Sequence, residues 1–187
     1  MKKVNTLPDI VLETPRLWLR PPRPEDFEPF AAMSTDVEVM KHLGGVQPRP
    51  VAWRSFAGMA GSWSLLGFGM FSLIEKTTGR WLGRVGPICP DGWPGTEVGW
   101  GVTREAQGKG FAYEAAVACM DYAVDVLGWT EVIHCIDDVN ERSAALAQRL
   151  GSQRLRRAMM PPPLDLELQV WGQTADAWRE RRASLAV

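Results

Sequence analysis

Two glycines spaced two residues apart, Gly108 and Gly110, lie between an extended segment and an alanine-rich segment. Residues 96–103 are rich in β-branched and aromatic side chains, which indicates a strand, and the residues after Gly110 predict a helix. Glycine lets the backbone approach a ligand closely, because it has no Cβ. The first N–H groups of a helix have no partner inside the helix and carry partial positive charge. This segment therefore predicts an anion site, for which phosphate is the commonest ligand.

Two nucleotide-binding motifs fit this segment poorly. A mononucleotide loop needs G-x-x-x-x-G-K-[ST], but Thr103 replaces its first glycine and Gly110 replaces its Ser or Thr. A dinucleotide motif needs G-x-G-x-x-G, and Tyr113 replaces its third glycine. We therefore disfavour a nucleotide-binding protein. A plain strand-to-helix turn, with glycines that serve geometry alone, is the other alternative.

Several short segments follow one another along the chain. They are Leu12-Glu13-Thr14-Pro15-Arg16-Leu17, Leu19-Arg20-Pro21, Glu25-Asp26-Phe27, Glu97-Val98-Gly99-Trp100, Gln107-Gly108-Lys109-Gly110-Phe111-Ala112, Glu114-Ala115-Ala116, Asn140-Glu141-Arg142-Ser143 and Leu150-Gly151. The hexapeptide at 107–112 resembles the Q/R-x-x-G-x-G/A signature with which the GNAT superfamily of N-acetyltransferases binds the pyrophosphate of acetyl-coenzyme A. Together the segments resemble the branch similar to ribosomal-protein N-terminal (alanine/serine) acetyltransferases, over roughly residues 11–172.

The resemblance implies an α/β fold. Its mixed, mostly antiparallel central sheet would splay between the fourth and fifth strands and be flanked by helices. It also implies acetyl-CoA as co-substrate and no metal. The pantetheine arm would lie along the central strand, where a backbone amide of Gly101 or Val102 would polarise the thioester carbonyl. The expected coenzyme-binding residues are Gly101, Val102, Thr103, Gln107, Gly108, Lys109, Gly110, Phe111, Ala112 and Asn140.

Acetyl transfer to an amine requires a group that accepts a proton. Glu97 is the first candidate for a catalytic base, by resemblance to carboxylates that family members place on this strand. Its alternative is a charge at the strand edge in solvent or in an ion pair. Asp137 and Asp138 are fallback candidates, for which we favour turn and cap chemistry. We expect His134 in a buried strand and His42 at the surface.

The leaving thiolate needs modest help from an acid. Many family members use a tyrosine on the helix after the fifth strand, but Tyr113 and Tyr122 both fall on the earlier helix. The resembling branch carries Asn140 and Ser143 in that region, where Asn140 would bond the pantetheine and Ser143 would donate to the sulfur as a catalytic residue. Asn140 also suits a helix N-cap, and both roles can hold, because a cap uses one side-chain oxygen. Ser143 is equally consistent with a small first-turn residue.

Periodicity predicts the elements that would position these groups. The expected strands cover 16–20, 66–74, 80–89, 96–103, 131–137, 154–160 and 164–171. The expected helices begin near Pro24 and Thr35 and cover about 48–60, 111–127, 140–150 and 174–184. Val51 is expected on the buried face of the third helix with Phe56 and Met59, and Val126 on that of the long fourth helix.

Composition limits the class of protein. With 187 residues we expect a single GNAT acetyltransferase domain over 1–187, as a monomer or homodimer. A formal net charge of −1 argues against nucleic acid and anionic membranes as partners. Three cysteines without metal-type spacing suggest free thiols in a reducing cytoplasm. We therefore expect a cytoplasmic, acetyl-CoA-dependent N-acetyltransferase with direct transfer to a primary amine, a protein N-terminal α-amine first. The alternatives are a small-molecule amine (antibiotic or polyamine) as acceptor, or a non-catalytic acyl-CoA sensor.

Overall fold

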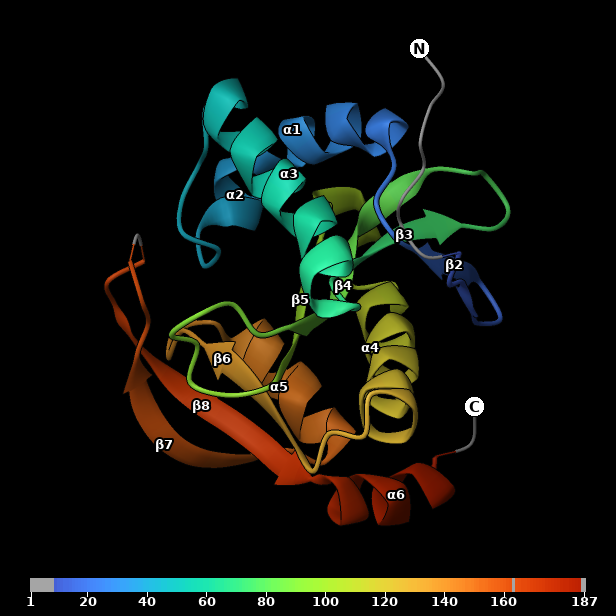
Figure 1. Cartoon of the computed structure of the whole chain (residues 1–187), viewed down its shortest axis with the longest axis vertical. Coiled ribbons are helices and arrows are strands. Elements are labelled where there is room, and N and C mark those ends of the chain that lie inside the picture. Colours follow the sequence, from blue (N-terminus) through green and yellow to red (C-terminus); the bar gives the residue numbers. More distant parts are fainter. Residues whose placement is uncertain (1–8, 163, 186–187) are drawn as a thin grey trace. The chain divides into compact units, whose positions relative to one another are not determined.

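The computed structural model describes residues 9–162 and 164–185, whose strands follow the order β1-β2-β3-β4-β5-β6-β8-β7 in one sheet (Figure 1). The strands are β1 Leu12–Glu13, β2 Leu17–Arg20, β3 Phe71–Glu75, β4 Trp81–Ile88, β5 Glu97–Val102, β6 Glu131–Ile136, β7 Gln153–Met159 and β8 Glu167–Thr174. The α-helices are α1 Phe27–Ser34, α2 Val37–Met40, α3 Arg49–Leu66, α4 Phe111–Asp121, α5 Glu141–Leu150 and α6 Ala175–Ala183. The pair of β5 and β6 is parallel, and the other pairs with a described register are antiparallel. The predicted mixed, mostly antiparallel α/β class is confirmed.

The chain divides into two compact units, which are described separately below. The first unit contains the residues up to Val85 together with Trp100–Ala115. The second contains Gly86–Gly99 together with the residues from Ala116 onward. Strands β4 and β5 and helix α4 contribute residues to both units.

Aromatic rings fill the core of the first unit between α1, α3 and the sheet. The Phe30 ring centroid lies 5.3 Å from that of Phe56 on α3 and 6.2 Å from that of Trp81 on β4. Trp63, near the end of α3, contacts Phe71 on β3 with ring centroids 4.8 Å apart. Such tilted and edge-to-face pairs add to the stabilisation that burial provides.

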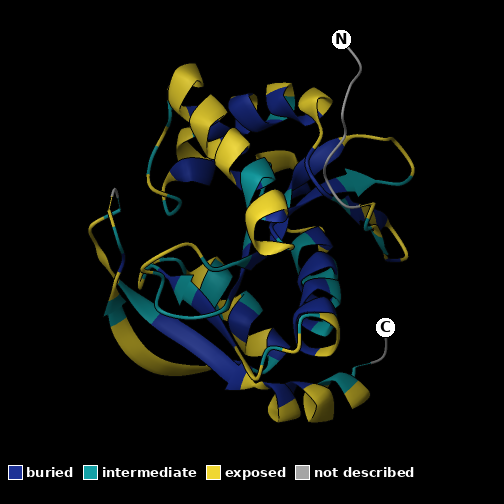
Figure 2. Cartoon of the chain, viewed as in Figure 1, coloured by how far each residue is buried: buried dark blue, intermediate teal, exposed yellow. Residues whose placement is uncertain are grey.

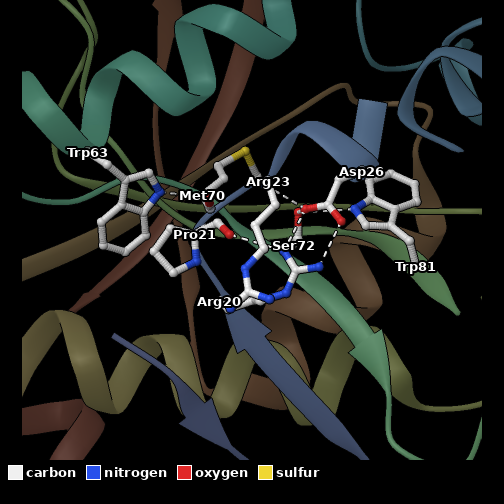
Figure 3. A network of polar contacts seen from close by, with 8 residues as sticks. All are labelled: Arg20, Pro21, Arg23, Asp26, Trp63, Met70, Ser72 and Trp81. Atoms are coloured by element: carbon white, nitrogen blue, oxygen red, sulfur yellow. Dashed lines mark hydrogen bonds and ion pairs between the residues drawn. The ribbon is translucent and has the colours of Figure 1, made fainter. Parts of the chain in front are cut away.

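A buried carboxylate attaches the start of α1 to the sheet (Figure 3). Asp26, which is 2% exposed, accepts two hydrogen bonds from the Arg20 guanidinium at 2.7 and 2.8 Å. It also accepts the Arg23 backbone N–H at 2.9 Å and the Ser72 hydroxyl at 2.7 Å, and Ser72 in turn accepts the Trp81 indole N–H at 3.1 Å. The network therefore joins β2, β3 and β4 to the N-terminal turn that precedes α1.

Helix α3 is longer than the sequence predicts. It runs to Leu66, and Gly67 ends it in the left-handed conformation at φ 76°, so the next strand begins at Phe71 and not at Leu66. The predicted burial of Val51 is wrong, because Ala52, Phe56, Met59 and Trp63 form the buried face. Phe56 and Met59 are buried as predicted.

The second unit is built on the antiparallel strands β6, β8 and β7. The register of β6 and β8 extends from Glu131 opposite Thr174 to Ile136 opposite Gln169. Figure 2 shows a buried stretch of β8 beside the mostly exposed strand β7. Helix α6 is fixed by Trp178, which is 1% exposed and donates its indole N–H to Asp121 Oδ1 at 3.0 Å.

The helix that follows the glycine turn ends in a π-helical segment, Tyr122–Val126. The extra residue per turn changes the side-chain phase, and Val126 is 68% exposed, contrary to prediction. The predicted cap of α5 by Asn140 is present, and Gly151 is the C-cap of this helix. Asp36 caps α2 and Thr174 caps α6. Within the described ranges, none of the helices has the length and apolar character that a membrane span requires.

Candidate coenzyme and acyl-transfer site

The glycine loop has the backbone geometry that the sequence predicts. After β5 and a short 3-10 turn at Arg104–Ala106, residues 107–110 form a turn, and α4 begins at Phe111. Gly108 and Gly110 have φ values of +73° and +80°, which side chains other than glycine adopt with strain. Because Gly108, Lys109 and Gly110 are exposed, the backbone at the start of an eleven-residue helix is accessible to an anion.

Strand β5 lies very close to β4 at Gly83. A Cβ built on Gly83 would lie 2.4 Å from the Gly101 carbonyl oxygen and 2.7 Å from Val102 Cα. The Thr103 N–H donates to the Leu82 carbonyl at 2.8 Å. Gly83 was not predicted as part of the site, although a glycine inside a strand often marks a place where another backbone approaches closely.

The side-chain hydroxyl of Thr103 has unused hydrogen-bonding capacity. Its Oγ1 is buried, and no hydrogen-bond partner is found for it among the described residues. Thr103 also lines a hollow of about 360 Å³ together with Asp36 and Arg104. A buried hydroxyl of this kind is costly unless a ligand or water satisfies it, which fits the prediction that the coenzyme passes this strand end.

The predicted loop residues 107–112 and strand residues 101–103 both lie in the first unit. The same unit contains a group of three side chains, Thr14, Arg16 and Glu114, that was not predicted as part of the site. Glu114, on the first turn of α4, accepts the Arg16 Nε–H at 2.5 Å and the Thr14 hydroxyl at 2.6 Å. Arg16 also donates from Nη1 to the Lys109 carbonyl at 2.9 Å. Thr14, Arg16 and Glu114 were noted only as parts of the resemblance, and their separation of about 100 residues hides the contact from the sequence.

Glu97 is buried in the second unit. The residue as a whole is 5% exposed. Its Oε2 accepts the Trp93 indole N–H at 2.6 Å, and its Oε1 accepts the Cys135 N–H at 3.2 Å. The alternative of a strand-edge charge in solvent is therefore wrong. Trp93, in the loop before β5, was missed because a loop tryptophan has no periodic signal.

The parallel ladder between β5 and β6 is very short. Among the described residues its register consists of Glu97 opposite Ile133, with the Ile133 N–H donating to Thr96 O at 2.9 Å. The next backbone groups bond to side chains instead: the Cys135 N–H donates to Glu97, and the Val98 carbonyl accepts from His134 Nδ1 at 2.7 Å. These are the fourth and fifth predicted strands, so the break lies where the resemblance implies a splay.

His134 is a core residue, as predicted. Since the Val98 carbonyl can only accept, Nδ1 carries the proton and Nε2 accepts from the Ser152 hydroxyl at 3.0 Å. Burial lowers the pKa of His134 to about 4, against the opposing effect of the Val98 hydrogen bond. The ring is therefore neutral at pH 7 and fixes the Val98 carbonyl rather than exchanging protons.

Asn140 and Ser143 lie together at the start of α5. Asn140 Oδ1 accepts the Ser143 backbone N–H at 3.2 Å, and both residues are half-buried. The cap uses the oxygen of Asn140 and leaves its amide N–H₂ for another partner. Asp138 is exposed and forms an ion pair with Arg157 at 2.5 Å. Tyr113 and Tyr122 lie on α4 and its π-helical extension, as predicted.

A cavity of about 230 Å³ lies in the first unit among α1, α2, α3 and β4. Its lining residues are Phe30, Met33, Ser34, Met40, Gln47, Ser55, Met59 and Arg84. Arg84 carries the charge in this lining, and it donates from Nη1 to Met70 Sδ at 2.9 Å. The loop that contributes Gln47 also places Leu43 against β5, where Leu43 Cδ1 would be 3.1 Å from a Cβ on Gly101.

Known proteins resemble this chain in sequence and in structure. Residues 16–153 match the acetyltransferase (GNAT) domain. The uncharacterised N-acetyltransferase p20 of Bacillus licheniformis is 31% identical over 146 residues, which cover 76% of this chain and 82% of that protein. The crystal structure of the acetyltransferase from Agrobacterium tumefaciens str. C58 is 28% identical with a TM-score of 0.78, covering 89% of this chain and 95% of that one.

A ribosomal-protein-S5-alanine acetyltransferase from Vibrio fischeri shares the fold. Its TM-score is 0.66 at 17% identity, with 91% of this chain and 99% of that chain covered. The family match covers most of the chain, and the glycine loop and the β5 strand end suit a coenzyme with a pyrophosphate. The chain therefore belongs to the GNAT family and is an acyl-CoA-dependent N-acetyltransferase, for which the family implies acetyl-CoA as the donor.

Proposed function

We propose that this N-acetyltransferase moves the acetyl group directly to a primary amine, with the α-amine of a protein N-terminus as its acceptor. Acetyl-CoA supplies the acetyl group as a thioester. In the transfer, the amine nitrogen forms a bond to the carbonyl carbon, the carbon–sulfur bond breaks, and the amine loses one proton. The residues proposed below account for that proton, for the charge on the carbonyl oxygen and for the leaving thiolate.

Glu97 is proposed as the base that accepts the amine proton. Two N–H donors, from Trp93 and Cys135, hold its carboxylate in one orientation inside the protein. An α-amine has an ordinary pKa of about 7.7–8.0, so a carboxylate or a short water chain suffices as base near neutral pH. A backbone amide at Gly101 or Val102 is proposed to stabilise the carbonyl oxygen, and the Ser143 hydroxyl to donate a hydrogen bond to the departing thiolate.

The state of the cysteines supports direct transfer. Burial, together with the charge of Glu97 and a hydrogen bond to it, raises the pKa of the Cys135 thiol well above its ordinary value. Burial raises the pKa of Cys119 in the same direction. A thiol with a raised pKa is a poor nucleophile, because the thiolate is the reactive form. A covalent acetyl group on Cys119 or Cys135 is therefore not part of the proposal.

The cavity in the first unit is the observation that carries the choice of acceptor. Its lining is rich in methionine, which adapts to apolar groups of different shape, and a cavity of 150 Å³ already holds benzene. The positive charge of Arg84 disfavours polycations such as polyamines and aminoglycosides. The cavity, in which three methionines and Phe30 lie beside Ser34, Gln47, Ser55 and Arg84, is proposed to hold the first side chain of a peptide. The name of the Vibrio fischeri neighbour, a ribosomal-protein-S5-alanine acetyltransferase, suggests the same acceptor class.

The direct test is release of free CoA from acetyl-CoA with a panel of acceptors. The panel contains peptides with alanine, serine, methionine or phenylalanine at a free N-terminus, a lysine peptide with a blocked N-terminus, spermidine and an aminoglycoside. Because the protein has three free cysteines, mass spectrometry of the acceptor replaces thiol reagents as the readout. Acetylation of N-terminal peptides alone is expected. Faster acetylation of spermidine or of the aminoglycoside would refute the α-amine proposal.

A variant that fills the cavity tests the role of its lining. Met59→Phe adds volume to the wall and is expected to raise KM for the peptide while KM for acetyl-CoA stays unchanged. Leu65→Phe is the matched control, because Leu65 lies on the same helix and is 85% exposed. Equal peptide KM values for the Met59 variant and the wild type would show that the acceptor binds elsewhere.

A further inference from the structure

Arg16, in the turn between β1 and β2, contacts both the glycine loop and the first turn of α4 with its side chain. Nε donates to Glu114 Oε2 at 2.5 Å and Nη1 donates to the Lys109 carbonyl at 2.9 Å. The guanidinium carbon lies 4.4 Å from the centroid of the Phe111 ring, and Nη2 would lie 3.3 Å from a Cβ on Gly110. One side chain thus reaches the last residues of the loop and the first turn of α4.

The backbone of Arg16 is itself fixed. Its N–H donates to Glu114 Oε1 at 2.8 Å, and its carbonyl accepts the Lys76 N–H at 2.9 Å at the end of β3. Thr14 is 9% exposed, accepts the Leu17 N–H at 3.0 Å and donates to the same Glu114 oxygen. The guanidinium is therefore presented from a rigid turn attached to the sheet edge.

The bond to the Lys109 carbonyl determines the direction of an amide. In a trans peptide the C=O and the following N–H point in opposite directions, because the unit is planar. With the Lys109 carbonyl held on the guanidinium, the Gly110 N–H must point away from Arg16. Gly110 can accept this peptide orientation because its φ of +80° costs it nothing.

The same side chain controls the charge at the helix start. Glu114 lies on the first turn of α4, where a carboxylate competes with an anionic ligand for the positive end of the helix. Burial acts to raise the pKa of Glu114, but hydrogen bonds from Thr14 and Arg16 outweigh it and lower the pKa. Glu114 is thus ionised, and its oxygens are bonded to the β1–β2 turn.

We propose that Arg16 is a positioning residue for coenzyme binding: it orients the Lys109–Gly110 peptide and neutralises Glu114, so that the loop presents its amides to the diphosphate. This inference rests on the proposed role of residues 107–112 in binding the diphosphate. The shape of the loop then depends on a residue more than 90 positions away in the sequence. Thr14 and Glu114 take part in the same set of contacts.

The affinity for CoA, measured by isothermal titration calorimetry, is the first test. Arg16→Met keeps length and apolar contact with Phe111 but removes both charged hydrogen bonds. We expect the Kd for CoA to rise roughly tenfold or more, as for loss of a charge-assisted hydrogen bond. Arg16→Lys keeps the charge but lacks the planar fork that reaches Lys109 and Glu114 together, so a clear loss is expected for it as well.

Arg49→Met is the matched control. Arg49, on α3 in the same unit, makes the same kinds of contact with α1. Its guanidinium donates two hydrogen bonds to Glu28 and lies 4.7 Å from the Phe27 ring centroid. It should leave the Kd for CoA unchanged while it removes an equivalent set of surface interactions. A rise in Kd with Arg49→Met as large as that with Arg16→Met would overturn the specific role of Arg16.

A truncated donor separates loop positioning from a general structural effect. S-acetylpantetheine lacks the diphosphate, so kcat/KM with this donor should be equal in wild type and Arg16→Met, whereas kcat/KM with acetyl-CoA should fall. Equal losses for both donors would overturn the inference, and so would wild-type affinity for CoA in Arg16→Lys. A wild-type protein that fails to bind CoA would overturn the coenzyme role of the loop itself, which is a distinguishable result.

Discussion

Glu97 combines burial with two N–H donors, and that combination limits what it can do. The Trp93 and Cys135 N–H groups fix both oxygens of its carboxylate. A carboxylate held in this way keeps a single orientation. An α-amine, which is partly neutral near pH 7, needs a weaker base than a lysine side chain with an ordinary pKa of about 10.4.

Glu97→Gln tests this role with little change in volume. We expect kcat to fall by roughly a hundredfold or more, as for loss of a general base, and the Kd for CoA to stay unchanged. Glu131→Gln, an exposed carboxylate on β6 in the same unit, is the control and should keep full activity. Full turnover in Glu97→Gln would show that Glu97 is not the base and that its buried carboxylate has a structural role only.

His134 makes the stability of the second unit depend on pH. Its folded pKa of about 4 lies below the ordinary value of 6.5, so the unfolded chain binds a proton over a range in which the folded protein does not. Stability is therefore complete above about pH 6.5 and is lost progressively as the pH falls towards 4. The loss should be on the order of 3 kcal/mol, since each pKa unit is worth about 1.4 kcal/mol.

Urea unfolding of wild type and His134→Gln between pH 7.5 and pH 4.5 measures this effect. Other carboxylates titrate in both proteins, so the difference between the two slopes is the relevant quantity. The variant should be less stable at pH 7.5, because Ser152 and Val98 lose a partner, but should lose less on acidification. Parallel slopes would contradict the assignment of a buried neutral histidine.

At the level of elements, local patterns predicted most of the fold. The turn of Gly108 and Gly110 and the cap at Asn140 were correct because each depends on a few neighbouring residues. The predicted end of α3 was wrong, because the apolar run after Trp63 continues past Leu66. In such a run, a helix and a buried strand have the same sequence pattern. Contacts such as Arg16 with Glu114 depend on the tertiary fold and leave no local pattern.

The break in the β5–β6 ladder lies where the sequence resemblance implied it, and the structure shows which side chains stabilise it. The resemblance implied a splay at this place, and the residues show how its start is stabilised. Glu97 and His134 satisfy the backbone groups of Cys135 and Val98 that a longer ladder would have paired. Unpaired buried backbone groups would otherwise destabilise the fold by an amount comparable to a lost hydrogen bond.

The attachment of α1 to the sheet depends on the single side chain of Asp26. Asp26→Ala leaves the Arg20 guanidinium buried without its partner, since the Arg20 side chain is 13% exposed. The expected loss in the free energy of unfolding is about 3–5 kcal/mol. Glu28→Ala, which breaks an exposed pair with Arg49, should change stability little and serves as the control in chemical denaturation. Similar midpoints for the two variants would show that α1 is held by its aromatic contacts alone.

At the level of the whole molecule, the two compact units share three elements. Strands β4 and β5 and helix α4 each continue from one unit into the other, so neither unit can unfold without disrupting elements of its neighbour. The single domain over 1–187 stays a prediction, which this continuity makes testable. The continuity also means that a ligand of the loop at 107–112, which belongs to the first unit, should stabilise the second unit.

Fluorine NMR of protein labelled with 5-fluorotryptophan tests this coupling, because the nine tryptophans are spread over both units. The first unit contains Trp18, Trp53, Trp63, Trp81 and Trp100, and the second contains Trp93, Trp129, Trp171 and Trp178. Single Trp→Phe replacements assign the resonances. In urea, all native resonances should disappear with one midpoint.

Coenzyme binding makes the test stricter. CoA at a hundred times its Kd should stabilise the folded state by about 2.7 kcal/mol, and a single cooperative domain requires the same upward shift of the midpoint for every tryptophan. Trp178, buried in the second unit, is the decisive reporter, since it lies on α6, outside the unit that contains the loop. A shift confined to the tryptophans of the first unit would mean that β4, β5 and α4 do not transmit stability, and the chain would then have to be treated as two domains.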